Sequence, residues 1–161
     1  MTLDDLNALP RGAFVDKLGW IFENSPWVAE RAWDRRPFAS LDALHSAMVS
    51  EVERATRDEQ LALLRAHPDL RARAKLSAAS QQEQGGLGTL SEGELRSLRS
   101  ANHAYREKFD FPFLYAVKGS NWHDILLALV VRMDNDPEEE FHIALFEVFR
   151  IARFRLEAVI A

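Results

Sequence analysis

The chain has no cysteine among its 161 residues. This absence excludes disulfide bonds, thiol nucleophiles, iron–sulfur clusters and cysteine-based zinc sites, and it fits a reducing compartment. The sequence also lacks an apolar run of the roughly 18 residues that a membrane span requires. A secretory signal has an apolar run flanked by basic residues. The N-terminus of this chain is acidic and has no such run. We therefore predict a cytoplasmic protein with no membrane partner.

Positive charge is in deficit as well. Twenty lysines and arginines stand against 25 aspartates and glutamates, for a formal net charge of −5. Proteins that bind a phosphate backbone need a basic face, so we expect no nucleic-acid partner. The sequence contains neither the His-Glu-x-x-His motif of zinc enzymes nor a glycine-rich phosphate loop, so we expect no metal and no cofactor. Small molecules and proteins remain as partners.

Apolar residues are plentiful and recur at helical rather than strand spacing, as at Phe14, Leu18 and Phe22. Capping-box signatures and proline-led starts mark the expected boundaries. A chain of this length can bury roughly 70% of its unfolded surface in one core. We predict an all-α, single-domain bundle of about seven to nine helices over residues 1–161. The expected helices lie near 11–24, 27–35, 40–54, 56–67, 92–109, 121–134 and from 137 onward.

Two segments do not fit the helical pattern. The glycine-rich stretch 84–90 predicts a flexible connection. Residues 108–121 are apolar but contain an internal proline and a glycine, so we expect extended chain packed on the core. Its free backbone groups then need partners, which a ligand could supply.

One histidine differs from the rest. His67 directly precedes Pro68, which disfavours helical geometry at the residue before it, so the imidazole is expected at the end of a helix. The others fall within predicted helices or next to a cap. We expect structural or solvated positions for these four, which are His45, His103, His123 and His142.

Three polar residues that follow also share one helical face. Ser80, Glu83 and Gln84 stand at positions i, i+3 and i+4. On spacing alone, Ser80 and Glu83 more simply form a capping box at a helix start. A catalytic or binding role for them stays open at this point.

Four motifs in order resemble a known enzyme family. They are HPDL at 67–70, SQQEQ at 80–84, NHAYREKFDFPFLYAVKG at 102–119 and EVFRIARFRL at 147–156. Together they resemble the 2-oxo-4-hydroxy-4-carboxy-5-ureidoimidazoline (OHCU) decarboxylases, from about residue 10 to the end. The resemblance implies an all-α, cofactor-free homodimer that converts OHCU to (S)-allantoin in urate degradation. The chain departs from the family in the short spacing of EQGGL after the second motif.

The resemblance also implies roles for individual residues. It implies that His67 is the catalytic acid/base and that Glu83 is its partner at the reacting carbon. Arg155 would pair with a carboxylate of the substrate, with Arg153 as the fallback for that role. The remaining implied substrate-binding residues are Pro68, Ser80, Gln84, Phe113, Leu114, Tyr115, Ala116 and Val117.

Two alternatives belong to other classes. A helical protein-interaction module would use an apolar groove for a partner helix and would tolerate the loss of His67. A decarboxylase paralogue would keep the fold and the site but act on a related ureido or imidazoline compound.

Overall fold

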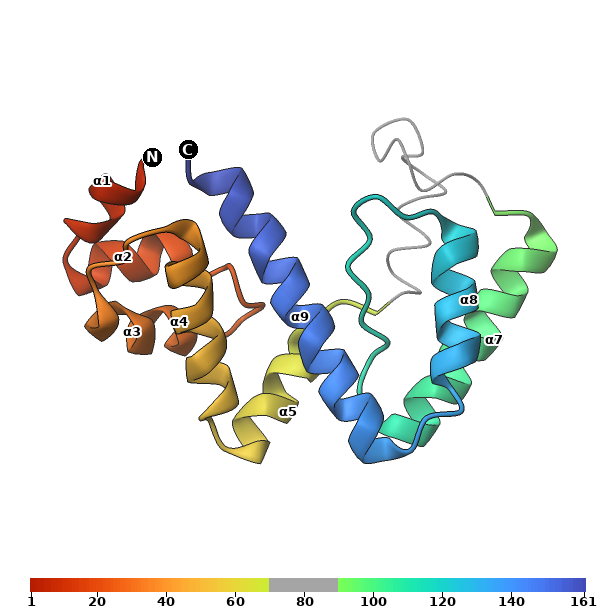
Figure 1. The fold of residues 1–161 in the computed structure, drawn as a ribbon. Helices are drawn as coiled ribbons and strands as arrows, with labels where there is room; N and C mark the ends of the chain where they lie inside the picture. Colours follow the sequence, from red (N-terminus) through yellow and green to blue (C-terminus); the bar gives the residue numbers. More distant parts are fainter. Residues whose placement is uncertain (70–89) are drawn as a thin grey trace. The chain divides into compact units, whose positions relative to one another are not determined.

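The computed structural model describes residues 1–69 and 90–161. In this part the chain forms eight α-helices and one 3-10 helix, with no strand, which confirms the all-α class for these residues. No helix here is long and apolar enough to cross a membrane. The helices are α1 (Leu3–Asn7), α2 (Arg11–Leu18), α3 (Trp27–Ala32), η1 (Trp33–Arg35), α4 (Leu41–Glu53), α5 (Arg57–Ala66), α7 (Glu92–Phe109), α8 (Trp122–Arg132) and α9 (Pro137–Val159) (Figure 1).

The chain divides into two compact units, which we describe separately. Unit 1 comprises Met1–Ala66 and Val148–Ala161, and unit 2 comprises His67–Glu147. Helix α9 contributes residues to both units. The single-domain organisation predicted for residues 1–161 stays a prediction.

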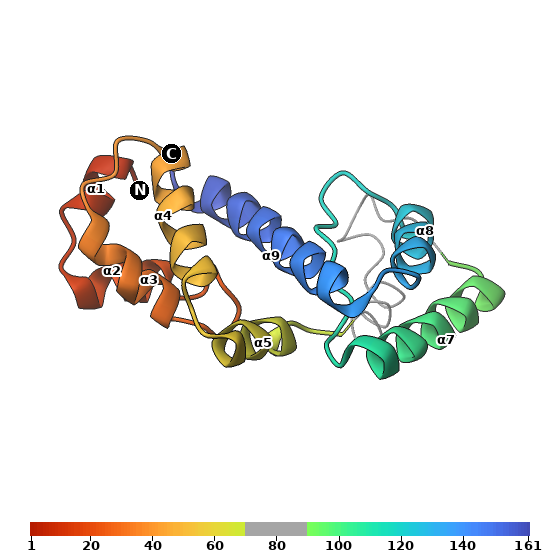
Figure 2. The same ribbon diagram turned by 60° about the horizontal axis from the view of Figure 1, so that its bottom comes forward.

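Unit 1 contains the helices from α1 to α5 and the C-terminal part of α9 (Figure 2). Its two ends are joined by a hydrogen bond from the Ala161 amide to the Met1 carbonyl, with an N···O distance of 2.9 Å. Helix α1 was not predicted. A capping box between Thr2 and Asp5 starts it, but its five residues are too few to show a helical period.

Helix α2 is shorter than the predicted helix over 11–24. It ends at Leu18, and a Cβ atom at the next residue, Gly19, would lie 2.6 Å from the Val15 carbonyl oxygen. This close approach requires glycine at that position. The chain then turns and places Ile21 and Phe22 in the core without further helix.

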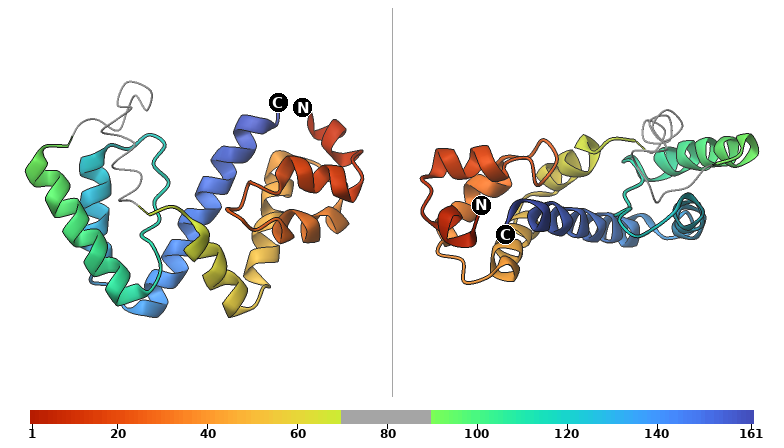
Figure 3. Two further views of the ribbon diagram at one scale, coloured as in Figure 1. Left: turned by 180° about the vertical axis from the view of Figure 1, so that it is seen from behind. Right: turned by 90° about the horizontal axis from the view of Figure 1, so that it is seen from above.

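Unit 2 contains α7, α8 and the first half of α9 (Figure 3). The predicted capping boxes are present, with Ser91 and Glu94 at the start of α7 and Asn121 and Asp124 at the start of α8. Helix α8 ends at Arg132, two residues before the predicted end. Between α7 and α8 the chain is not helical, as predicted for this apolar segment. Asp110, with a φ of 63°, ends α7 in the left-handed conformation.

Candidate active site

His67 lies at the end of α5, as its position before Pro68 predicted. The helix ends at Ala66, and the His67 residue is only 6% exposed. In the described part of the chain no other histidine is buried. The others have ordinary positions: His45 Nε2 is 2.8 Å from the Phe149 carbonyl oxygen, and the remaining three lie exposed beside glutamates. The burial of His67 therefore sets it apart from the other four histidines, in agreement with the prediction from the proline that follows it.

The turn that carries His67 is anchored to α7. Asp69 accepts a hydrogen bond of 2.5 Å from the Asn102 side-chain amide, and it forms an ion pair of 3.2 Å with Arg106. Asn102 is buried, and its Oδ1 has no hydrogen-bond partner in the described residues. The anchor fixes the backbone two residues after the histidine, and the Oδ1 atom of Asn102 is a buried acceptor on the residue that binds Asp69. Neither Asp69 nor Asn102 was predicted as a functional residue, although both lie in the quoted motifs.

The segment Phe113–Val117 follows α7 as non-helical chain and is mostly buried. It runs beside residues 67–69 in all three sets of views (Figures 1, 2 and 3). Two of its backbone groups bind buried charged side chains. The Leu114 carbonyl accepts a hydrogen bond of 2.7 Å from Arg132, and the Ala116 amide donates one of 3.1 Å to Glu147. The sequence thus predicted an irregular segment, and the structure adds the side chains that hold it.

A buried ionic cluster supports this segment. Arg132 donates hydrogen bonds to both carboxylate oxygens of Glu140, the shortest at 2.6 Å, and Glu140 also accepts hydrogen bonds from the Tyr105 hydroxyl and from Asn135. The Arg132 guanidinium lies 4.3 Å from the centre of the Phe113 ring. Burial, and then the hydrogen bond to Glu140, raise the pKa of Tyr105 above its usual range. The buried carboxylate is therefore both paired and hydrogen bonded, as a buried charge must be.

Arg155 lies in unit 1, on α9. Its guanidinium donates hydrogen bonds to the carbonyls of Trp20 and Ile21, at 3.0 and 3.2 Å, and pairs with Glu23 at 2.8 Å. It is therefore held in place, and it lines a pocket together with residues of the 15–26 region. The predicted role for Arg155 on a substrate carboxylate stays a prediction.

Arg153, the fallback for that role, is held by side chains alone. It pairs with Asp42 and with Glu157, the latter at 2.9 Å, and no backbone carbonyl accepts from it in the described residues. Hydrogen bonds to backbone carbonyls thus distinguish the two arginines.

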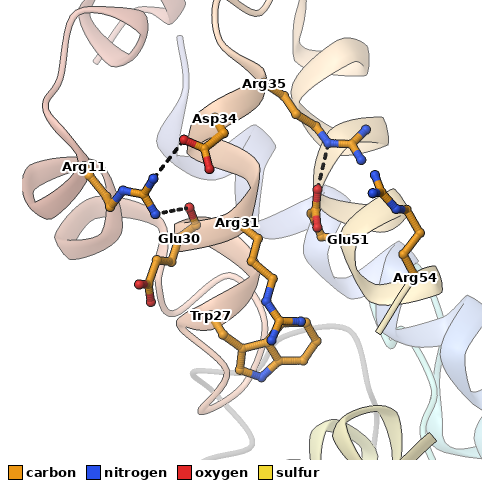
Figure 4. Close-up of a pocket in the computed structure, with 8 residues that line it drawn as sticks. All are labelled: Arg11, Trp27, Glu30, Arg31, Asp34, Arg35, Glu51 and Arg54. Atoms are coloured by element: carbon orange, nitrogen blue, oxygen red, sulfur yellow. Dashed lines mark hydrogen bonds and ion pairs between the residues drawn. The ribbon is translucent and has the colours of Figure 1, made fainter. Parts of the chain in front are cut away.

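Another pocket in unit 1 is rich in charge but does not involve any predicted residue (Figure 4). Arg11 pairs with Asp34 at 2.8 Å and Arg35 pairs with Glu51 at 2.7 Å across its wall. Arg31 lies over the Trp27 ring. The Arg11–Asp34 pair is exposed, and ion pairs of this kind are weakened by water and salt and contribute little. We assign no role to this pocket.

Three predicted residues lie outside the described part of the chain. These are Ser80, Glu83 and Gln84, and the EQGGL stretch lies outside it too. Within residues 1–69 and 90–161, no three His, Asp or Glu side chains gather as a metal site would require. Pro68 is described and is exposed next to His67.

Comparison with known proteins places the chain in a family. A family model described as OHCU decarboxylase matches residues 7–157. The chain is 48% identical over 158 residues to the 2-oxo-4-hydroxy-4-carboxy-5-ureidoimidazoline decarboxylase of Haloferax volcanii, with 97% of this chain and 94% of that protein covered. It is 44% identical over 161 residues to the uric acid degradation bifunctional protein of Bacillus subtilis, with 99% of this chain covered but only 33% of that protein.

A solved structure is similar over the whole chain. The crystal structure of (S)-allantoin synthase superposes with a TM-score of 0.83 at 34% identity, with 99% of this chain and 54% of that chain covered. The chain thus spans about half of that protein and a third of the Bacillus protein. The match to the family model and the identity to the Haloferax protein both extend over nearly the full sequence. The chain therefore belongs to the OHCU decarboxylase family.

Proposed function

We propose that this chain is a carboxy-lyase that converts OHCU to (S)-allantoin and CO2 in urate degradation, without a metal or an organic cofactor. The observation that carries the proposal is the position of His67. It is the buried histidine of the described residues, it ends α5, and it lies in the first of the four motifs that resemble the family. The names of the Haloferax and Bacillus relatives and of the allantoin synthase structure support the same reaction.

The substrate itself can accept the electron pair that is released when CO2 leaves. The bond between the ring carbon and its carboxylate breaks, and CO2 leaves. The electron pair moves toward the adjacent C=N bond, whose nitrogen takes up a proton, so the ring carbon that kept the hydroxyl becomes part of an enol. The enol then loses its O–H proton and takes up a proton at the neighbouring carbon, which restores the ring carbonyl and yields allantoin. No external electron sink is required.

His67 is the group that moves the protons. An imidazole can both accept and donate a proton near neutral pH, which makes histidine the commonest general acid/base. A ring fixed by burial at a helix end presents its nitrogens in one direction. Glu83 is the proposed partner of His67, because a carboxylate beside an imidazole fixes its tautomer and favours its charged form.

The other proposed site residues hold the substrate. Ser80 and Gln84 supply hydrogen bonds to the ureido-imidazoline, and Pro68 forms a wall. The backbone of Phe113–Val117 meets the amide edges of the ring. Arg155 pairs with the carboxylate, a task that suits a guanidinium already oriented by two carbonyls.

We also propose a homodimer in the cytoplasm. On α8, Leu127, Val130 and Val131 are between 56% and 65% exposed and share one helical face. Contiguous exposed apolar side chains of this kind are typical of a protein interface. Sedimentation velocity tests the dimer: wild type should sediment at twice the mass of the chain, and Val130→Glu should sediment as a monomer.

The reaction is tested with substrate generated in situ, since OHCU is unstable. The purified chain is dialysed against a strong chelator and the loss of OHCU absorbance is compared with a blank. We expect faster loss than in the blank, and no further gain when zinc or magnesium is added. A rate equal to the blank, or activity that returns only with metal, contradicts the proposal.

A further inference from the structure

In the described part of the chain, the hydrogen bonds between buried side chains and the Phe113–Val117 segment lie along one edge. In extended backbone, the N–H and C=O groups of alternate residues point to opposite sides. Leu114 and Ala116 are two residues apart, so the carbonyl that binds Arg132 and the amide that binds Glu147 lie on the same edge. The N–H and C=O of Tyr115 then point to the opposite edge.

On that second edge the Val117 carbonyl accepts a hydrogen bond of 2.9 Å from the Ser120 amide, but the Tyr115 peptide groups have no partner in the described residues. Neither the Tyr115 amide nor its carbonyl forms a hydrogen bond within residues 1–69 and 90–161, although the Tyr115 hydroxyl pairs with Ser120 at 3.1 Å. Tyr115 is half-buried, and its ring stacks on Phe113. Backbone groups in such a position are normally paired. A ligand with a carbonyl oxygen and an N–H group would pair with both, much as a neighbouring strand does.

The side chains that bind the first edge are both buried. Arg132 is 8% exposed and Glu147 is 5% exposed. Glu140, which is fully buried, binds the Arg132 guanidinium through several hydrogen bonds. A buried charge held by a second buried charge has little freedom to move. The Leu114 carbonyl is therefore bound by a guanidinium with little freedom to move, and the Ala116 amide is bound by a carboxylate that is itself buried.

We propose that Arg132 and Glu147 are positioning residues, which hold one edge of the Phe113–Val117 segment so that the Tyr115 peptide groups face an amide-containing ligand. The Tyr115 amide donates to a carbonyl oxygen of the ligand, and the Tyr115 carbonyl accepts from a ligand N–H. This proposal rests on the proposed function, because it assumes that the ligand is the ureido-imidazoline. Arg132 and Glu147 act through the backbone and do not touch the substrate.

Two variants of Glu147 separate positioning from simple structural support. Glu147→Gln keeps the size and an oxygen acceptor for the Ala116 amide, whereas Glu147→Leu has a similar size but no acceptor. We expect Glu147→Leu to raise the KM for OHCU by about 10- to 100-fold, the effect of one hydrogen bond to a charged group. We expect Glu147→Gln to stay close to wild type in KM. If both variants raise KM equally, or if Glu147→Leu lowers only the melting temperature, the proposal is wrong.

Amide hydrogen exchange of the wild-type protein, followed by NMR, needs no variant and no turnover. Without ligand, the Ala116 amide should exchange slowly, because Glu147 binds it, and the Tyr115 amide should exchange faster. Addition of (S)-allantoin should protect the Tyr115 amide. If the protein consumes OHCU but (S)-allantoin leaves Tyr115 unprotected, the positioning proposal alone fails. If the protein does not consume OHCU, the proposed function fails and this proposal fails with it.

Discussion

At the scale of single residues, His67 combines two properties that a general acid/base needs. It lies at the end of α5, and it is buried, so little water can compete for a proton that it transfers. Asp69, two residues later, is anchored to Asn102 and Arg106 on α7, which limits how far the backbone next to His67 can shift. Position and anchoring together explain why this histidine, and not an exposed one, is proposed for catalysis.

The substitution His67→Asn should abolish most of the activity and leave the protein folded. Asparagine can replace some of the polar contacts of the ring but cannot exchange a proton near neutral pH. We expect kcat to fall by about 10²- to 10⁴-fold, the usual contribution of a general acid/base. His103→Asn is the matched control, since His103 is exposed beside Glu107. Turnover near the wild-type rate in His67→Asn, with a normal circular dichroism spectrum, would favour the protein-interaction module instead.

Arg155 and Arg153 offer a second comparison at this scale. Arg155→Ala should raise KM by about 10- to 100-fold, because it removes a hydrogen-bonded charge that the substrate carboxylate would otherwise meet. Arg153→Ala should leave KM unchanged, because Arg153 forms only partly exposed ion pairs with Asp42 and Glu157. Steady-state kinetics with thermal melting of both variants measures this. The reverse pattern would move the role to Arg153.

Some residues of the candidate site could be predicted from the sequence, and others could not. The histidine before a proline could be identified from the sequence because proline constrains its neighbour locally. The cluster that holds the Phe113–Val117 segment could not, because Tyr105 and Glu140 are 35 residues apart and only the fold brings them together. One signal was available for Arg132: it stands in the apolar stretch of α8, where an arginine is rarely buried unless it is paired.

At the scale of secondary structure, helix starts were predicted better than helix ends. The starts of α7 and α8 depend on side chains within three residues of each other, so the sequence shows them directly. Helix α2 ends at Leu18, and the close contact between Gly19 and Val15 that follows is visible only in the fold. The short helix α1 was missed, since five residues carry almost no period. Helix caps made by residues close in sequence can thus be predicted, whereas contacts that form only in the folded chain cannot.

Tyr105 and Glu140 link α7 to α9, and this link should depend on pH. The raised pKa of Tyr105 means that the folded state keeps a phenol proton which the unfolded chain releases above a pH of about 10. The link should therefore contribute fully below that pH and weaken as the pH rises. The free energy of unfolding should fall by up to about 1.4 kcal/mol per pH unit in that range.

Urea unfolding of wild type and Tyr105→Phe between pH 8 and pH 11 isolates this effect, because the two proteins share every other titrating group. We expect the difference in stability between them to shrink as the pH rises above about 10. Parallel pH profiles would show that the Tyr105 proton is not held by the fold.

At the scale of the whole molecule, the all-α class and the order of the helices followed from periodicity and caps, while the division into two compact units did not. That division depends on contacts between distant residues, and no linker composition marks it in the sequence. The proposed reaction is also a property of the whole molecule, since it requires residues from several elements to hold one ring and deliver one proton. A protein that only binds the ring would have no control over the face that is protonated.

The handedness of the product therefore tests the central claim most directly. OHCU decays unaided to racemic allantoin, so only a catalyst that delivers the last proton to one face produces an excess of one enantiomer. The measurement is the circular dichroism of allantoin formed from OHCU generated in situ, with enough protein to outrun spontaneous decay, and with His67→Asn as the control. We predict an excess of (S)-allantoin with the wild-type protein and a racemate with the variant. Racemic allantoin from wild-type protein that consumes OHCU faster than the blank would contradict the proposed site.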